Sequence, residues 1–231
     1  MKNRNLFVDS EIYDLASLWI LRAIFCAGGQ REFLKSKYGN LLEFLEINSD
    51  EPTQQDIKTL KDKLAVLEKS KISCELKELE YNLNLLQANL GLNNTEKAIL
   101  RFVAIMFNYE IVSDACELTE NLNDRQAAKA ISQILNLSFI DVQKAFKKDG
   151  IFAKTSLIKL DIYGRNLRSK IDVINNDFIG ALFVKCESID EIFASTIKPC
   201  SNTNLTLKNY AHIKDDAQIL ISFLKNAIRK R

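Results

Sequence analysis

The stretch AKAISQILNLSFIDVQKAFKKDGIFAKTSLIKLD, residues 128–161, decides which fold we expect for this chain. Together with the residues just before it, its apolar spacing predicts one helix from Asp124 to Leu135 and another from Ser138 to Phe146. The dipeptide Asn136-Leu137 forms a short turn between them. Two short helices joined by a tight turn have the geometry of a helix-turn-helix unit.

The end of the same stretch predicts a small β-ribbon. Asp149-Gly150 is a turn signal, and it is followed by two short apolar segments, Ile151-Phe152 and Ser156 to Leu160, that are expected to pair as strands. Helices followed by a ribbon occur in this order in a winged-helix domain. We therefore expect residues 91–161 to form a winged-helix-like module.

The first helix of this module is predicted from its start signal, GLNNTEKAILRF. Asn93 or Asn94 is a suitable N-cap, and Glu96 in the first turn lies at the positive end of the helix macrodipole. The buried face of this helix is predicted from its helical spacing to comprise Ile99, Leu100, Val103 and Phe107.

The sequence of residues 1–90 predicts a helical domain. Ser10 is a candidate cap for a buried helix that ends at Gly28-Gly29, and residues 31–47 form a second helical stretch with a break near Gly39. A polar loop is expected over 48–56.

Leucine and isoleucine residues recur at helical spacing over 57–67 and again over 72–90. The register slips between these two segments, and fewer than three heptads are sustained. An intramolecular helical hairpin is therefore favoured over an intermolecular coiled coil.

The sequence of residues 162–231 predicts a helical connector. Helical segments are expected around 171–184 and 189–193, and a loop with Pro199 follows them. An amphipathic helix from Lys214 to Ile228 ends the chain. The predicted fold is thus mainly α, with a helical N-terminal bundle, a winged-helix-like middle module and this connector.

Composition excludes several other classes of protein. Of the 231 residues 47% are apolar, only seven are Gly and two Pro, and 32 basic against 30 acidic side chains leave a net charge of +2. The five cysteines include no C-x-x-C pair, so reduced thiols are expected rather than disulfides or zinc ligands. The apolar stretch Leu15 to Cys26 contains Arg22 and is shorter than the ~20 residues of a membrane span, so we expect a cytoplasmic protein without a membrane anchor.

Motifs of catalysis are not found in the sequence. It contains no G-x-x-x-x-G-K-[ST], G-x-G-x-x-G, H-E-x-x-H or G-x-S-x-G motif, and His212 is the only histidine. We therefore expect no catalytic residue, metal or cofactor in this chain.

Residues 125–159 carry seven basic side chains against two acidic ones. Nucleic-acid contact is therefore considered at Arg125, Lys144, Lys147, Lys148 and Lys154, with Lys129 and Lys159 completing the basic set. A DNA reader needs polar side chains early in its recognition helix, whereas SFIDVQKAF begins with bulky apolar residues. Protein contact is the favoured use of this module.

Three stretches together resemble the region preceding the ATPase core in a family of bacterial AAA-type ATPases. They are NLNLLQANLGLNNTEKAILRF, the stretch 128–161 quoted above, and LTLKNYAHIKDDAQILISFLKNAI at 205–228. Two departures from the family pattern are Ser156, where the family usually has glycine, and Asn209-Tyr210, where it has aspartate-phenylalanine.

The resemblance implies a non-catalytic N-terminal region that binds a protein substrate or adaptor. The ATPase core would lie beyond Arg231, so ATP, Mg²⁺ and oligomerisation would belong to the parent protein. Tyr210, Ala211, His212 and Ile213 would flank its nucleotide. The alternatives are a stand-alone winged-helix DNA-binding regulator and a purely structural helical module.

Overall fold

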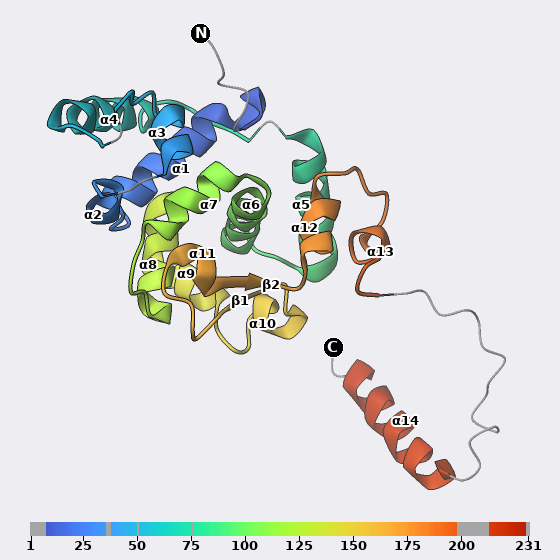
Figure 1. Cartoon of the computed structure of the whole chain (residues 1–231). Helices are drawn as coiled ribbons and strands as arrows, with labels where there is room; N and C mark the ends of the chain where they lie inside the picture. Colours follow the sequence, from blue (N-terminus) through green and yellow to red (C-terminus); the bar gives the residue numbers. More distant parts are fainter. Residues whose placement is uncertain (1–7, 36–37, 50, 75, 198–212, 230–231) are drawn as a thin grey trace. The chain divides into compact units, whose positions relative to one another are not determined.

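The computed structural model describes residues 8–35, 38–49, 51–74, 76–197 and 213–229. In these residues the chain is mainly helical, with one two-stranded antiparallel sheet (Figure 1). It divides into two compact units, Met1–Thr196 and Ile197–Arg231, and each is described by itself.

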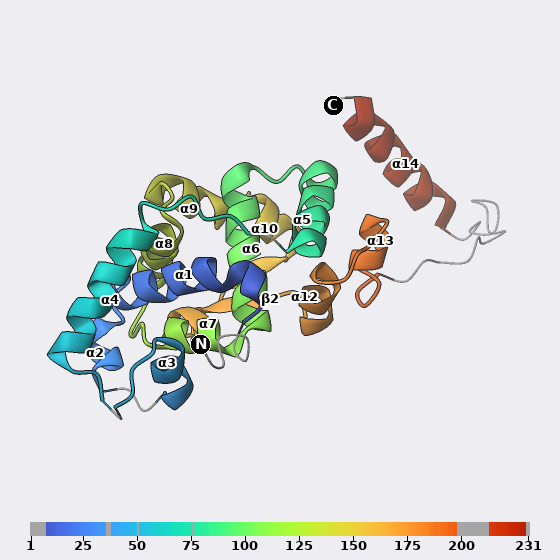
Figure 2. The same cartoon turned by 90° about the horizontal axis from the view of Figure 1, so that it is seen from above.

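Helix α1 (Tyr13–Phe25) lies at the centre of the N-terminal part, because nearly all of its side chains are apolar and buried. It packs against α4 (Gln54–Leu67), α7 (Glu110–Glu117) and α8 (Asp124–Leu135), as Figures 1 and 2 show. The expected Ser10 cap is wrong, since Ser10 begins the short 3-10 helix Ser10–Ile12 that precedes α1.

Two short helices, α2 (Gln30–Phe33) and α3 (Gly39–Phe44), follow on either side of the predicted break. The polar loop after them is shorter than expected. Thr53 and Asp56 form a reciprocal capping box, with the Asp56 amide donating to Thr53 Oγ1 at 3.2 Å, so α4 begins at Gln54.

The predicted hairpin of the two leucine-rich segments is wrong. Helix α4 packs on α1, whereas α5 (Lys77–Leu90) packs on α6 (Asn94–Asn108) and α12 (Asn176–Leu182), and α4 and α5 lie apart in Figures 1 and 2. The end of α4 is held elsewhere, because Arg22 Nε donates to Glu68 Oε1 at 2.7 Å while Arg22 Nη1 donates to the Ile134 carbonyl at 2.9 Å.

Helices α6 and α8 of the middle region each begin with a side-chain cap, of which the one at Asn93 was predicted. Asn93 and Glu96 form a capping box at α6, and Asn123 and Gln126 form another at α8. Asn136 adopts a left-handed backbone with φ 53° and ends α8. The next helix, α9 (Phe139–Ala145), packs closely on α8, so the predicted helix-turn-helix arrangement is present.

The ribbon forms, but its predicted pairing is wrong. Residues Ile151–Thr155 form the short helix α10. Strand β1 (Ile158–Leu160) instead pairs antiparallel with β2 (Ile171–Val173), in the register Ile158 to Val173. The short helix α11 (Leu167–Lys170) lies between the strands in sequence.

The reason for the different pairing is local. Burial of Phe152 favours a helical turn after Gly150, and Ser156 ends that turn in the left-handed region with φ 55°. The helix predicted over 171–184 is accordingly shorter, because its first three residues form β2 and only Asn176–Leu182 are helical. Helix α13 (Ile189–Ile192) follows as predicted.

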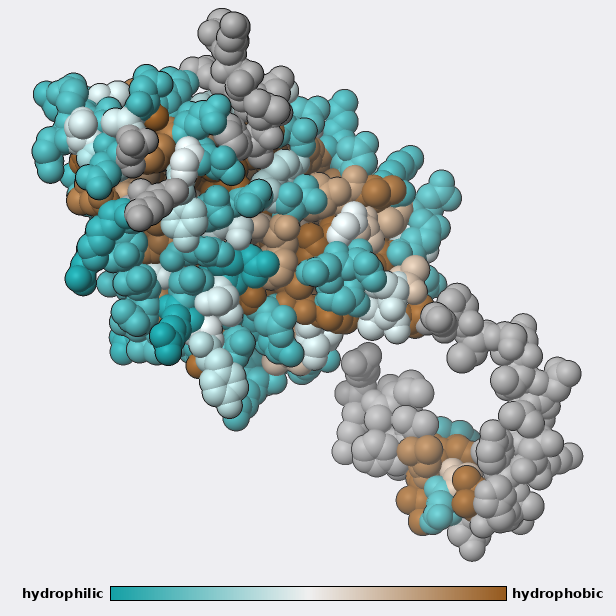
Figure 3. Space-filling view, in the orientation of Figure 1, coloured by the Kyte–Doolittle hydropathy of each residue, from teal (hydrophilic) through white to brown (hydrophobic). Residues whose placement is uncertain are grey.

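The second unit contains helix α14 (Lys214–Arg229), close to its predicted bounds. Ile219 and Leu220 are exposed on it, and Figure 3 shows hydrophobic residues at its surface. Among the described residues of the whole chain, no helix combines the length and apolar character needed to cross a membrane.

A candidate binding cleft beside the helix-turn-helix pair

A concave site lies where α8, α9, α10 and β1 meet. It is a cleft of about 350 Å³, and we call it the α8–α10 cleft. Its apolar lining includes Ala128, Phe146, Phe152, Ala153 and Ile158, and Arg125 and Lys148 are among its charged lining residues. A concave, apolar site with a few convergent polar groups is the usual form of a ligand site.

Local sequence signals build the walls of this cleft. The Asn123 cap starts α8, so that Arg125 lies in its exposed first turn. The connection from α9 to α10 turns at Gly150, where an added Cβ would lie 3.1 Å from the carbonyl oxygens of Ala145 and Lys147. The rings of Phe146 and Phe152 then approach to 5.8 Å.

The charges at the cleft are not balanced. Asp124, its one acidic lining residue, is paired with Lys170, whose Nζ lies 2.9 Å from Asp124 Oδ1 and whose side chain is 3% exposed. Lys159 pairs with Asp172 at 3.1 Å on the ribbon. Within the described part of the chain, Arg125 and Lys148 have no carboxylate partner. The cleft therefore presents net positive charge beside an apolar lining.

A second cleft, of about 470 Å³, shares Arg125 with the first. It is lined by Lys129, Ser132 and Phe139 among others. The Arg125 guanidinium carbon lies 5.9 Å from the centroid of the Phe139 ring, a distance at which cation–π attraction operates. Arg125 is thus the cation common to both clefts.

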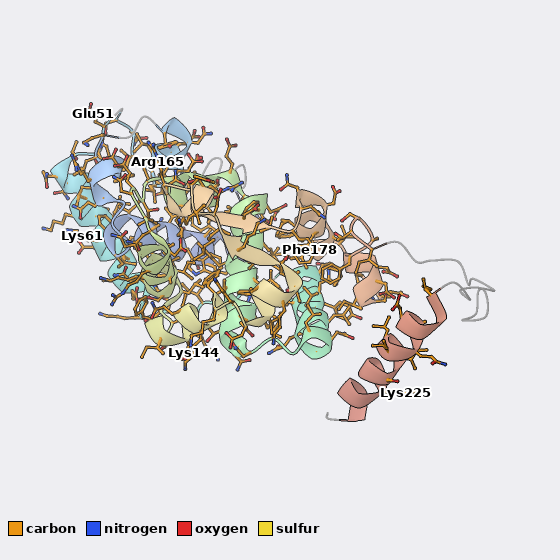
Figure 4. All side chains as sticks on the ribbon, turned by 90° about the horizontal axis from the view of Figure 1, so that it is seen from below. Glu51, Lys61, Lys144, Arg165, Phe178 and Lys225 are labelled. Carbon is orange, nitrogen blue, oxygen red and sulfur yellow. The ribbon has the colours of Figure 1, made fainter. Side chains whose placement is uncertain are left out.

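Only some of the basic residues singled out in the sequence line the two clefts, Lys159 and Lys129 among them. Arg125 and Lys148 line the α8–α10 cleft, whereas Lys144, Lys147 and Lys154 line neither cleft. Lys144 lies at the outer edge of its unit in Figure 4 and pairs with Asp141 at 3.0 Å. Its hydrogen bond lowers the pKa of the Asp141 carboxyl.

The residues expected to flank a nucleotide receive no structural support. Tyr210, Ala211 and His212 lie outside the described residues, as does Cys200. Ile213 belongs to the second unit and is 42% exposed.

Acidic side chains and thiols are the other chemically reactive groups of the described residues. Among the residues that the structure describes, no three His, Cys, Asp or Glu side chains form a group able to hold a metal ion. Cys26, Cys74, Cys116 and Cys186 are free thiols, and burial raises the pKa of each. Raised pKa values disfavour the reactive thiolate.

One carboxyl has a strongly shifted pKa, and it lies on α7, outside both clefts. Burial, with the neighbouring carboxylates Glu110 and Glu117, raises the pKa of Asp114 to about 6. Near Asp114, the Tyr38 hydroxyl donates to Glu117 at 3.1 Å. The raised pKa of Asp114 makes the stability of the fold depend on pH.

Sequence reasoning missed the apolar lining of the α8–α10 cleft. The available signal was the position of Phe146 and Phe152 on either side of the Asp149-Gly150 turn, which brings their rings together if a helix follows the turn. Assigning a strand to Ile151-Phe152 removed that possibility.

Comparison with known proteins gives no relative for this chain. No family model, curated protein or solved structure matches it.

Proposed function

We propose that the chain is a non-catalytic region that binds a protein partner through the helix-turn-helix pair and the α8–α10 cleft. The observation that carries this proposal is the apolar cleft with unpaired Arg125 and Lys148 in its lining. An apolar cavity gives a partner side chain somewhere to be buried, and cations at its edge select the charge of that partner.

The setting that we propose is an AAA-type remodelling ATPase, with ATP and Mg²⁺ bound by a core outside this chain and with a cytoplasmic location. The basis is the resemblance of the three stretches described above. A structural detail supports it: Ser156 stands where that family usually has glycine, and its φ of 55° lies in the left-handed region that favours glycine.

Within this setting the α8–α9 pair and the β1–β2 ribbon would act as a winged-helix-like module. Its α9 helix begins with Phe139 and Ile140, and Ile140 is 62% exposed. An exposed apolar residue at the start of this helix suits contact with protein better than hydrogen bonding to base edges. The module is therefore proposed as a protein-contact surface.

A library of random peptides displayed on phage tests this function. The wild-type chain is expected to retain peptides, and the Ala153→Trp variant is expected to retain few, because Ala153 is exposed and the larger ring fills the α8–α10 cleft. Retention of no peptides by the wild-type chain, or of the same peptides by both proteins, would argue against the cleft as a partner site.

DNA binding by a stand-alone regulator is the second candidate. The observation in its favour is that Lys147, Lys148 and Lys154 are exposed and have no carboxylate partner among the described residues. A gel shift with duplex DNA, repeated at increasing salt, tests it, because affinity for phosphates falls steeply as salt rises. Binding at ~50 mM salt that disappears at higher salt would favour the regulator.

A further inference from the structure

We infer that the α8–α10 cleft binds an acidic peptide segment with one apolar side chain as its anchor. This inference rests on the proposed function, because it names the class of partner that the same cleft would take.

The apolar anchor side chain of the peptide is inferred from the residues that line the α8–α10 cleft. Phe146 is half-buried and Ala153 is exposed, so apolar surface at the cleft is accessible to a partner, while Phe152 and Ile158 behind it are fully buried. A volume of about 350 Å³ is at the small end of the range for ligand sites. It therefore has room for a large apolar side chain with the chain that flanks it, rather than for a whole folded surface.

The acidic character of the partner peptide is inferred from the charged side chains that line the cleft. Asp124, the one carboxylate in the cleft lining, is already paired with the buried Lys170. Among the described residues, Arg125 and Lys148 therefore have no carboxylate partner. Arg125 lies in the exposed first turn of α8, where its planar guanidinium can hold a carboxylate with two parallel hydrogen bonds. A partner with carboxylates beside its anchor would complete both pairs.

A peptide fits these observations better than a nucleic acid. Useful affinity for a phosphate backbone requires several cations along one track, whereas only Arg125 and Lys148 are unpaired at this cleft. Lys144, the one basic residue of α9, is paired with Asp141. The apolar lining would meet no counterpart on a phosphate backbone.

Fluorescence anisotropy with three labelled peptides of equal length tests the inference. Each has a single Phe at its centre, flanked by Asp in the first, by Asn in the second and by Lys in the third. At low salt the full chain is expected to bind the Asp peptide about tenfold more tightly than the Asn peptide, and the Lys peptide least tightly. Replacing the central Phe by Gly is expected to abolish binding.

Charge-reversal variants assign the effect to the cleft. Arg125→Glu combined with Lys148→Glu is expected to remove the preference for Asp over Asn, and the folded state is expected to survive because both side chains are exposed. The matched control is Lys58→Glu, an exposed lysine on α4, which lines neither cleft. This control is expected to bind as the wild-type chain does.

The possible results separate the two proposals. If the Asn peptide binds as tightly as the Asp peptide and Ala153→Trp blocks both, the acidic partner is wrong while the partner-binding function stands. If no peptide binds and duplex DNA does, both proposals are wrong. If charge reversal at Lys58 weakens binding as much as reversal at the cleft, the preference is a general charge effect and the inference fails.

Discussion

Asn82 shows how one polar residue holds two distant segments together. It is fully buried in α5, and its Nδ2 donates to the carbonyls of Ala181, Leu182 and Val184 at 2.7–3.2 Å. Its Oδ1 accepts from the Cys186 amide at 3.3 Å. The Ala181 carbonyl also accepts from the Val184 amide at 3.3 Å and the Val184 carbonyl from the Cys186 thiol at 3.4 Å, so the Leu182 carbonyl at the end of α12 is the one that depends most on Asn82.

The Asn82→Ala variant is therefore expected to lower the free energy of unfolding by about 2–3 kcal/mol, because the Leu182 carbonyl and the Cys186 amide lose their Asn82 partner in the interior. Urea denaturation followed by circular dichroism measures this. Asn89→Ala, on the exposed side of the same helix, is the control and is expected to change stability by less than about 0.5 kcal/mol. Equal effects of the two substitutions would contradict the proposed role of Asn82.

Asp114 makes stability depend on pH. Its pKa is raised from 3.8 to about 6 in the folded protein, so the native state binds this proton more tightly than the unfolded state. The resulting contribution of Asp114 to the free energy of unfolding is present in full below pH 3.8 and is lost as the pH rises through about 6. After a discount for solvent screening of a partly exposed carboxyl, we expect its size to be about 1 kcal/mol.

The Asp114→Asn variant is accordingly expected to be more stable than the wild-type chain at pH 8 and to match it once Asp114 is protonated in both states. Thermal unfolding at a series of pH values measures the difference. The exposed Glu120→Gln is a suitable control and is expected to show little such change between the two ends of the series. A constant difference across the whole pH range would contradict the assigned cause.

At the scale of the elements, the starts of α6 and α8 could be predicted, whereas the start of α4 and the strand pairing could not. Asn93 and Asn123 sit three residues before Glu96 and Gln126, and this local signal fixed the beginning of α6 and α8. The pairing of β1 with β2 depends on residues 171–173, which follow a separate helical turn and carry no turn signal of a hairpin. The apolar lining of the cleft depended on the same region and was missed with it.

The end of α10 offers a test of this local structure. Ser156 has φ 55°, a conformation that costs an L-residue about 1–2 kcal/mol and glycine little. Ser156→Gly is therefore expected to raise the free energy of unfolding, by up to about 1 kcal/mol after the entropy of glycine in the unfolded chain is subtracted. Ser156→Val is expected to lower it.

Chemical denaturation of the two Ser156 variants, side by side, provides the measurement. The left-handed assignment requires that they shift the midpoint in opposite directions. Destabilisation by both would show that the residue has ordinary helical or extended backbone, and the end of α10 would then have to be redrawn.

At the scale of the whole molecule, the AAA-type proposal predicts a feature of the coding sequence. The coding sequence beyond Arg231 is expected to encode a β-branched strand followed by G-x-x-x-x-G-K-[ST], within roughly 20 residues, because a phosphate-binding loop requires that strand and helix context. Residues 1–231 alone are expected to show no ATP turnover. Activity in a purified sample, or a reading frame without this motif, would refute the assignment.

The central claim is that a partner binds at the α8–α10 cleft, and hydrogen–deuterium exchange locates binding most directly. The chain is measured with and without a peptide selected from the random library. We expect slower exchange of backbone amides in α9, α10 and β1 and at the start of α8 around Arg125, with α5, α12 and α13 unchanged. Slower exchange confined to α5, α12 and α13, with none at the cleft, would contradict the account.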